Sequence, residues 1–451
     1  MSRRRKILLG SLIGALADYR TRVNADGGVV EALTCANSLD ADVVMIPSGY
    51  KATKLYSQIG TDGVDDFDVA RNSVATRVNK LGLIEEVAID VPRLDYSDSN
   101  CPSLLLEPQS TNLLAYSEDF SDASWIKTNT TIIDNSVLSP RGDIDASLFA
   151  DDSTNDQHRL YYGVPTSLGS YTFSCFAKAG TGLWLKLMCY NGVSNIHGNF
   201  DLLNGTVGLK TGVTSNIEDY GNGWYKCSIS ADLLGSASSN FQIATMQNDE
   251  GGFPVIYSGS SDTWEIWGAQ LEALPYPTSY IPTVGSTVTR IADSVTGAGD
   301  ANSFNSEEGV LFVEMAALAD DLIGRFIDLS DGISYANGSV ELFYYSSSNR
   351  IRYSYRTSGS VVQSDLIYLS EDITQYLKIA CVWKINRFEL WVNGVKRVED
   401  TSGIVNTANL FTDLSFSRIN LGAKDNIYGK VKALKVFTTA LSDAQLETLT
   451  T

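Results

Sequence analysis

The side chains that could carry out catalysis are few and scattered along the chain. Its 451 residues include two histidines, His158 and His197, and both lie in polar, loop-like sequence. A serine or cysteine nucleophile usually needs a histidine base beside it, and zinc needs several Cys or His ligands at short spacing. The six cysteines show no Cys-x-x-Cys spacing, and no glycine-rich phosphate loop joins a strand to a helix. The sequence therefore predicts neither nucleophilic catalysis nor a zinc site.

Aromatic side chains offer a different chemistry, because a flat ring beside polar groups can stack against the apolar face of a sugar. The chain has seven tryptophans and 22 tyrosines, and most of the tryptophans must fill cores. Trp383 is in phase with Ile379 and Cys381, which predicts an interior position. Trp391 is out of phase with its apolar neighbours beside a hairpin tip, which predicts exposure. The carbohydrate-binding residues that we expect are Trp184, Tyr190, Trp264 and Trp391.

Acidic loops could supply the oxygen ligands that calcium prefers. Asp62-Gly63-Val64-Asp65-Asp66 is such a loop, but Asp151-Asp152 and Asp320-Asp321 are equally acidic. The oxygen ligands of a calcium ion come together only when loops fold, so an acidic run in the sequence does not identify a site. We expect these three runs to be solvated. We expect no cofactor and no secure metal site.

Composition indicates the elements that must position these residues. Only 19% of the residues are charged, 43% are hydrophobic, and there are 37 glycines, a pattern typical of strands joined by tight turns. The length predicts two to four domains. A net charge of −19 disfavours nucleic acid as a partner. Cys175, Cys189 and Cys227 lie in apolar strand-like runs, so we expect buried free thiols and assembly in a reducing cytoplasm.

The N-terminus combines a basic run, Arg3-Arg4-Arg5-Lys6, with an apolar run over 7–16. The pair imitates a secretory signal, and the apolar run is far shorter than the roughly 20 residues of a membrane-spanning helix. We expect a helix over 6–23 that buries its apolar side against a partner, and a second helical piece over 30–38. A cleaved leader is the alternative. The residues expected to attach to the partner are Ile7, Leu8, Leu9, Leu12, Ile13 and Leu16.

Residues 50–109 are rich in Asp, Gly, Pro and Asn, and they predict an extended connector that packs along a neighbouring protein. Two stretches stand out, Arg71-Asn72-Ser73-Val74-Ala75-Thr76-Arg77-Val78-Asn79 and Leu104-Leu105-Leu106-Glu107-Pro108-Gln109-Ser110-Thr111-Asn112. Together they closely resemble the R-x-S-x-A-T-R-V-N and LLLEPQ-x-T-N segment of phage structural proteins of the head-spike or tail-fibre type. The resemblance implies a virion protein and carries over no catalytic residue.

Two β-sandwiches are expected after the connector. In residues 110–291, Tyr171, Phe173, Cys175 and Ala177 fall on one face of a strand, and spaced strands predict a jelly-roll-like sandwich. The stretch from Gly223 to Ile229 and the closing segment resemble the carbohydrate-binding-module domain of the same phage proteins, which implies the fold and not an affinity.

Residues 292–451 are similar to the concanavalin-A-like or laminin-G lectin sandwich. Ser339–Tyr345 is expected to pair with Arg350–Arg356, Asn393-Gly394 predicts a hairpin turn, and Ser442 is expected to cap a short final helix. The concanavalin-A-like fold also hosts glucanases, whose carboxylates lie on one strand as Glu-x-Asp-x-Glu. Nothing in this chain matches that pattern, since Glu265-Ile266-Trp267 lacks the second acid and lies in the other sandwich.

The sequence thus predicts an all-β chain of tandem antiparallel β-sandwiches, jelly-roll-like and then concanavalin-A-like, after a short N-terminal helix and an extended connector. The segments are 1–49, 50–109, 110–291 and 292–451. The expected function is that of a phage virion surface protein, not an enzyme, which attaches to other virion proteins through its N-terminus and binds host glycans as a homotrimer. A polysaccharide depolymerase and a secreted bacterial adhesin are the alternatives.

Overall fold

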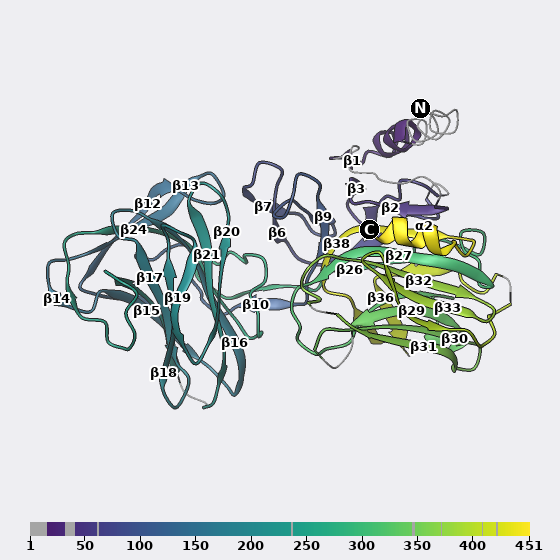
Figure 1. Cartoon of the computed structure of the whole chain (residues 1–451). Coiled ribbons are helices and arrows are strands. Elements are labelled where there is room, and N and C mark those ends of the chain that lie inside the picture. Colours follow the sequence, from purple (N-terminus) through teal and green to yellow (C-terminus); the bar gives the residue numbers. More distant parts are fainter. Residues whose placement is uncertain are drawn as a thin grey trace. The chain divides into compact units, whose positions relative to one another are not determined.

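The computed structural model describes residues 16–31, 41–60, 63–235, 238–344, 348–370, 372–407, 409–420 and 423–451. The described chain is almost entirely β, and its sheets form tandem antiparallel sandwiches, as the sequence predicted (Figure 1). Helical exceptions are residues 16–25, the short η1 (Tyr335–Asn337) and α2 (Asp443–Thr450). Among the described residues, no helix combines the length and apolar character needed to cross a bilayer.

The chain divides into two compact units. The central unit comprises residues 75–86 and 109–291. The composite unit comprises residues 87–108 and 292–451 together with the described residues up to Val74. This division differs from the four consecutive segments expected, because the chain passes from one unit to the other at residues 74, 86, 108 and 291.

The central unit is a sandwich of two six-stranded antiparallel sheets. Apolar residues alternate along its strands, so one side of each sheet faces the shared core; Tyr171, Phe173, Cys175 and Ala177 do so, as expected. The first sheet has the order β11 (Trp125–Thr128), β15 (Arg159–Pro165), β22 (Ser238–Met246), β17 (Trp184–Tyr190), β18 (Asn195–Asp201), β19 (Thr206–Thr211). The second has the order β12 (Thr130–Leu138), β13 (Ile144–Asp151), β24 (Thr263–Glu272), β16 (Gly169–Ala179), β21 (Trp224–Leu233), β20 (Thr214–Asp219).

The composite unit packs two larger sheets face to face around its main core. One sheet has the order β34 (Val395–Asp400), β33 (Arg387–Val392), β32 (Leu377–Lys384), β27 (Glu308–Ala317), β38 (Gly429–Phe437), β9 (Ser103–Leu106), β8 (Leu94–Asp95), and β2 (Val43–Met45) also pairs with β38. The other has the order β31 (Val361–Leu369), β30 (Arg350–Thr357), β29 (Ser339–Tyr344), β28 (Arg325–Ser330), β37 (Ala423–Asn426), β36 (Ser417–Asn420), and β35 (Asp413–Ser415) also pairs with β28.

Shorter strands complete the two units. A five-stranded sheet of the composite unit has the order β1 (Val29–Val30), β3 (Gly49–Lys51), β4 (Lys54–Leu55), β5 (Phe67–Ala70), β26 (Ser294–Thr296). Three two-stranded pairs are β10 (Ser110–Asn112) with β25 (Val288–Arg290), β14 (Asn155–Asp156) with β23 (Tyr257–Ser258), and β6 (Ala75–Val78) with β7 (Ile84–Val87).

The expected connector packs on its own chain, with residues 50–74 and 87–108 in the composite unit and 75–86 in the central unit, which corrects the prediction of an extended stretch. β38 has β27 on one side, and on the other side β2 pairs with Leu434–Val436 while β9 pairs with Gly429–Val431. The physical reason is that β38 would otherwise be an unpaired edge. The apolar runs of β2 and β9 cover that edge and fill the core between the sheets.

The described part of the N-terminal helix also packs on its own chain. Tyr19 and Val23 are buried against Tyr56, and the Tyr19 hydroxyl lies 3.1 Å from Ser48 Oγ. Residues 29–30 form β1 and not the start of a second helix. Leu16 is half-buried, whereas the other five expected attachment residues and positions 32–38 lie outside the described residues.

Several local expectations are confirmed. β29 pairs with β30, Asn393 and Gly394 adopt the positive φ angles that the turn between β33 and β34 needs, and Ser442 is the N-cap of α2. Cys175, Cys189, Cys227 and Cys381 are free and buried. Cys101 differs, because it is disulfide-bonded.

A buried cluster of charges ties three passages of the composite unit together. Arg93 donates to Glu107 Oε2 at 2.6 Å and also to Asp293. Arg71 donates to Asp293 Oδ1 at 3.2 Å and to the carbonyl oxygens of residues 73, 88 and 91. All four side chains are at most 4% exposed. Burial lowers the pKa of Arg93, but Asp293 and Glu107 outweigh burial and raise its pKa above the ordinary value.

Removing the shared carboxylate should destabilise this unit strongly. Asp293→Asn keeps the shape of the side chain but leaves two buried guanidinium groups without their common anion, so we expect a loss of about 3 kcal/mol in the free energy of unfolding. Asp68→Asn is the control, because Asp68 is 67% exposed in its pair with Lys54 and should lose less than about 1 kcal/mol. Urea unfolding measures both. Equal losses would contradict this account of the cluster.

Candidate functional site

The two predicted sugar-binding residues of the central unit lie on one face of one strand. Leu185, Leu187 and Cys189 of β17 point into the core, so the alternation places Trp184, Lys186, Met188 and Tyr190 on the outer face. Tyr190 is 42% exposed, and Trp184 is half-buried. Six strand residues separate the two rings by about 20 Å along the strand, and we call the surface between them the β17 face.

A short segment over 248–252 covers the Trp184 end of the β17 face. Lys186 Nζ donates to the carbonyl oxygens of Glu250 at 3.2 Å and Gly252 at 2.7 Å. Asn199 Nδ2 donates to Asp249 Oδ1 at 2.7 Å. Burial is the main reason why the pKa of Lys186 is lowered to about 8. The segment therefore holds a cation and an amide in fixed positions beside the tryptophan.

Glycine makes this arrangement possible on the neighbouring strand. A Cβ atom at Gly208 of β19 would lie 2.7 Å from Trp184 Cζ3 and 2.6 Å from Asp249 Oδ1, which is closer than real contacts allow. The ring and the carboxylate thus occupy the space that any other residue at position 208 would fill.

Two polar atoms of the same region lack a hydrogen-bond partner among the described residues. They are His197 Nε2 and Asn199 Oδ1, and both side chains are almost fully buried. Buried polar atoms normally bind protein groups or ordered water. Burial, followed by the charge of Lys186, lowers the pKa of His197 to about 4, against the opposing effect of Asp249. His197 is therefore a neutral hydrogen-bonding group at physiological pH.

Further planar groups lie on the next strands of this sheet. The Arg159 guanidinium lies 5.3 Å from the ring centroids of Tyr161 and Phe253, and its Nη1 donates to Gln242 Oε1 at 2.6 Å. The β17 face thus belongs to a sheet surface that carries rings beside amide, guanidinium and ammonium donors. That combination can hold the apolar face and the hydroxyls of a sugar at once.

The other two predicted sugar-binding residues are buried, which corrects the prediction. Trp264 is fully buried in the core between the sheets of the central unit. Trp391 lies on the outer side of its sheet, as its phase indicated, but Leu446 of α2 packs in the same cluster and leaves Trp391 only 6% exposed. Its indole nitrogen donates to Glu389 Oε2 at 2.9 Å. Neither ring can present a face to a ligand. Trp383 is in the core, as expected.

The acidic run that includes Asp65 and Asp66 is not solvated, which differs from the prediction. Asp65 and Asp66 are buried, and Asp66 accepts from Arg22 Nη1 at 2.6 Å and from the Ser57 amide at 2.8 Å. These bonds fix the described N-terminal helix to the loop. Among the described residues, no three Asp, Glu, His or Cys side chains converge to hold a metal ion.

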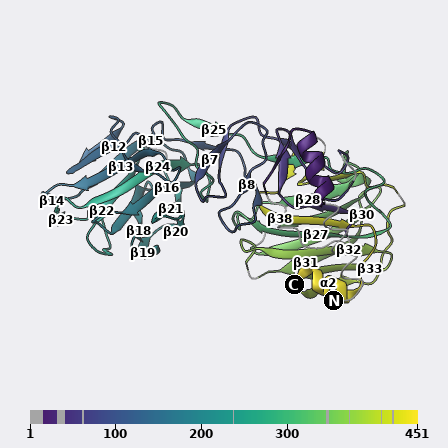
Figure 2. The same cartoon turned by 90° about the horizontal axis from the view of Figure 1, so that it is seen from above.

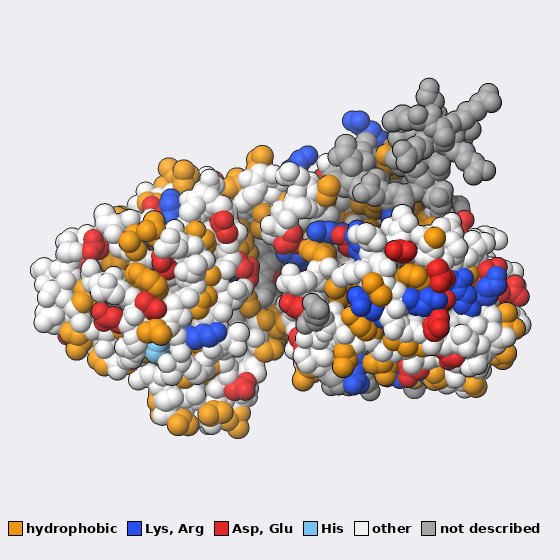
Figure 3. Space-filling view, viewed as in Figure 1, with side chains coloured by type: hydrophobic (Ala, Val, Ile, Leu, Met, Phe, Trp, Pro, Cys, Tyr) orange, Lys and Arg blue, Asp and Glu red, His pale blue; other side chains and the backbone are white. Residues whose placement is uncertain are grey.

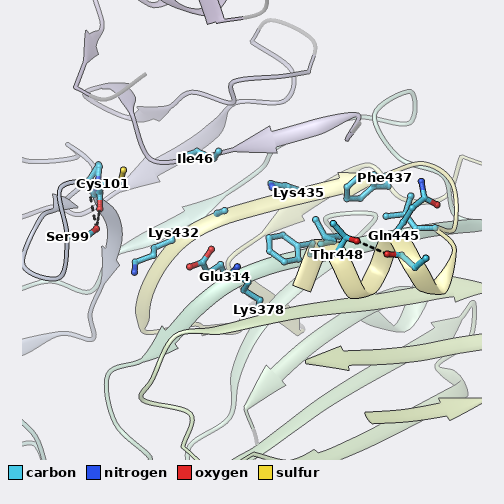
Figure 4. Close-up of a pocket in the computed structure, with 16 residues that line it drawn as sticks. Ile46, Ser99, Cys101, Glu314, Lys378, Lys432, Lys435, Phe437, Gln445 and Thr448 are labelled. Carbon is cyan, nitrogen blue, oxygen red and sulfur yellow. Dashed lines mark hydrogen bonds between the residues drawn. The ribbon is translucent and has the colours of Figure 1, made fainter. Parts of the chain in front are cut away.

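A separate pocket of about 630 Å³ lies in the composite unit. It opens on the outer face of the sheet of β27, β32 and β38, beside α2, which packs over β32 and β33 (Figure 1, Figure 2). In Figure 4, Ser99 and Cys101 lie at one end and Gln445 and Thr448 of α2 at the other. We call it the α2 pocket.

The α2 pocket contains three lysines and one glutamate. Lys378 Nζ donates to the carbonyl oxygen of Thr451 at 2.8 Å, and Lys432 Nζ lies 3.6 Å from the ring centroid of Tyr376. Burial lowers the pKa of Lys435 to about 8; Glu314 opposes this effect and Lys378 adds to it. The sequence analysis missed this pocket, because its walls come from segments far apart in the chain.

A buried carboxyl pair was also missed. Asp328 of β28 and Glu341 of β29 are direct cross-strand neighbours, and both are nearly inaccessible. Burial, followed by the charge of Glu341, raises the pKa of Asp328 well above its usual value. Arg356 Nε donates to Glu341 Oε2 at 2.9 Å. A glycosidase needs two carboxyl groups that reach the sugar from both sides, and these two do not reach the surface.

No protein-family model matches the sequence, and no curated protein matches it either. Similar solved structures include the CBM40 domain of the Ruminococcus gnavus IT-sialidase bound to α2,3-sialyllactose, with 14% identity over 32% of this chain and 83% of that one and a TM-score of 0.28. A heptameric SAP-like pentraxin from Limulus polyphemus has 12% identity over 33% and 71%, with a TM-score of 0.27.

The receptor-binding domain of the botulinum neurotoxin C/D mosaic serotype has 14% identity over 35% of this chain and 40% of that one, with a TM-score of 0.27. These neighbours are carbohydrate-binding and lectin-like binding domains. Similarities of this size are too weak to support an argument about the function of this chain.

His197 should make the central unit sensitive to acid. Its folded pKa of about 4 lies below the unfolded value of about 6.5, so the unfolded state takes up the proton first and stability falls as the pH drops from about 6.5 to about 4. We expect the wild type to lose about 1 to 2 kcal/mol more than His197→Gln between pH 7 and pH 5. Urea unfolding at both pH values measures this difference. Parallel losses in the two proteins would contradict it.

Proposed function

We propose that the protein is a non-catalytic adhesin that binds glycans at the β17 face of its central unit. The observation that carries the proposal is that Trp184 and Tyr190 lie on one outer strand face. Between and beside them are fixed polar groups with unpartnered atoms at His197 and Asn199. A sugar can stack on the exposed parts of the two rings, while the buried polar groups hold the Trp184 end of the face in a fixed shape.

Binding without catalysis fits the chemistry of the described groups. Lys186, His197 and Asn199 are buried beneath the β17 face, and Asp249 accepts from Asn199 Nδ2 and from the Leu209 amide at 2.9 Å. Hydrolysis of a glycosidic bond needs a second carboxyl group opposite the first. The acidic residues of the covering segment, Asp249 and Glu250, are neighbours in the chain and both lie at the Trp184 end of the β17 face.

We further propose that the adhesin is carried on the virion of a tailed phage, as a fibre, spike or decoration subunit, and that it is a homotrimer. The resemblance of residues 71–79 and 104–112 to phage structural proteins supports this proposal. Within the structure, Arg71 and Glu107 of these segments belong to the buried charge cluster, so the resembling residues organise the fold. We therefore assign attachment to the virion to the apolar N-terminal residues.

One observation favours a second candidate, a secreted bacterial adhesin with a cleaved leader. Cys101 is disulfide-bonded, and structural disulfides are typical of oxidising compartments. Sequencing of the mature N-terminus separates the two candidates. A start at Asp18 supports the secreted protein, whereas a retained N-terminus supports the virion protein.

Replacing the exposed rings should weaken glycan binding. We expect Trp184→Ala and Tyr190→Ala each to lower affinity for host polysaccharide about tenfold, because each removes one stacking surface worth about 1 to 1.5 kcal/mol. Printed capsular polysaccharides and lipopolysaccharides, followed by calorimetry on the strongest binder, measure the change. Ile133→Ala is the control, since Ile133 is exposed on β12 of the opposite sheet and should leave binding unchanged. Release of reducing sugar from the polysaccharide would instead favour a depolymerase.

The N-terminal apolar residues should be needed for incorporation into particles. Replacing Ile7, Leu8 and Leu9 by serine removes apolar surface that a virion partner would bury, so we expect most of the variant to be absent from purified particles. Leu81→Ser with Leu168→Ser is the control, because both leucines are exposed on the central unit. Immunoblotting of particles assembled with each variant measures incorporation. Equal incorporation of the two variants would contradict attachment through these residues.

A further inference from the structure

We propose that the α2 pocket is a second, independent ligand site and that it takes a small carboxylated saccharide. The first support is charge. The whole chain carries 53 acidic and 34 basic side chains, yet the charged residues that line this pocket are Lys378, Lys432, Lys435 and Glu314. A positive pocket on an acidic protein concentrates anions locally.

The outer surface of the same unit does not share this bias. In Figure 3, basic and acidic side chains of the composite unit lie next to one another on the visible face. Examples of such mixing are Arg387 with Asp443 at 3.0 Å and Lys396 with Glu399 at 3.0 Å. Neighbouring opposite charges largely cancel in water, so the pocket is distinguished by having three lysines and one carboxylate among its lining residues.

The second support is that apolar side chains line the pocket together with the charged ones, and Figure 4 shows Lys435 beside Phe437. Figure 4 shows Lys432, Glu314 and Lys378 grouped on one side, while Phe437 lies toward α2. Phe312, Leu441 and Leu449 also line the pocket. A ligand that fits must carry an anionic group and an apolar face. An acidic pyranose has both, because its axial C–H groups form an apolar ring face and its carboxylate projects from the ring edge.

The third support is that contacts hold the ammonium groups of Lys378 and Lys432 in place. An ammonium group has three donors. Lys378 uses one on the carbonyl oxygen of Thr451, and Lys432 faces the Tyr376 ring. The stems are therefore ordered before a ligand arrives, which reduces the entropy lost on binding. A volume of about 630 Å³ lies within the range of small-molecule sites, about 300 to 1,000 Å³.

Calorimetry with four probes tests the ligand class on the full-length protein. The probes are digalacturonic acid, the neutral disaccharide cellobiose, sodium acetate and sodium sulfate. We expect digalacturonic acid to bind at least tenfold more tightly than any of the other three, because it alone combines the carboxylate with the apolar ring face. Equal binding of sulfate would show a simple anion site, and equal binding of cellobiose would show that the lysines play no part. Either result overturns the proposal.

Single substitutions of lining lysines on β32 and β38 locate the site. Lys378→Gln and Lys432→Gln should each weaken digalacturonic acid binding about tenfold or more. Lys384→Gln is the matched control, because Lys384 lies on the same face of β32 as Lys378 but outside the pocket and pairs with Glu308. Trp184→Ala should leave this binding unchanged, so failure here and failure of the glycan proposal for the central unit are distinguishable. Wild-type affinity in both pocket variants would overturn the proposal.

Discussion

The composite unit depends on pairing two buried arginines with two buried carboxylates. Arg71 and Arg93 lose their hydration on folding, and the carboxylates of Asp293 and Glu107, together with backbone carbonyl oxygens around Arg71, compensate for that loss. Because the four residues come from three passages of the chain, the cluster specifies where each passage must lie. Glu107 follows β9 directly, and Asp293 precedes β26 directly. The cluster thus positions a strand that covers the edge of β38 and another that joins the smaller sheet.

The same arrangement provides the wall of the α2 pocket. Ser99, Cys101 and Pro102 line it, and they lie between Arg93 and Glu107 in the passage that the cluster fixes. α2 provides the opposite wall and buries Trp391 beneath it. In the central unit, segment 248–252 plays the corresponding part, because it covers one end of the β17 face and leaves Tyr190 at the other end exposed. In each unit, the covering element determines where a ligand could still bind.

The strands could be predicted from the sequence because apolar and polar residues alternate along a strand with a period of two, and this pattern involves only residues that are close in the chain. Tyr171, Phe173 and Cys175 follow that rule, and so does the pairing of β29 with β30. Long-range contacts could not be predicted in the same way. The phase of Trp391 showed correctly that it faces away from the main core, but the residue that covers it is Leu446. Residues 50–109 looked like a connector because their strands are short, and one of them, β9, has a partner strand more than 300 positions away.

The most direct test of the adhesin account is a crystal structure of the protein soaked with the polysaccharide fragment that binds it most tightly. The account predicts a sugar ring stacked on Trp184 or Tyr190. Density for the fragment elsewhere on the protein, with the β17 face holding only water, would contradict it.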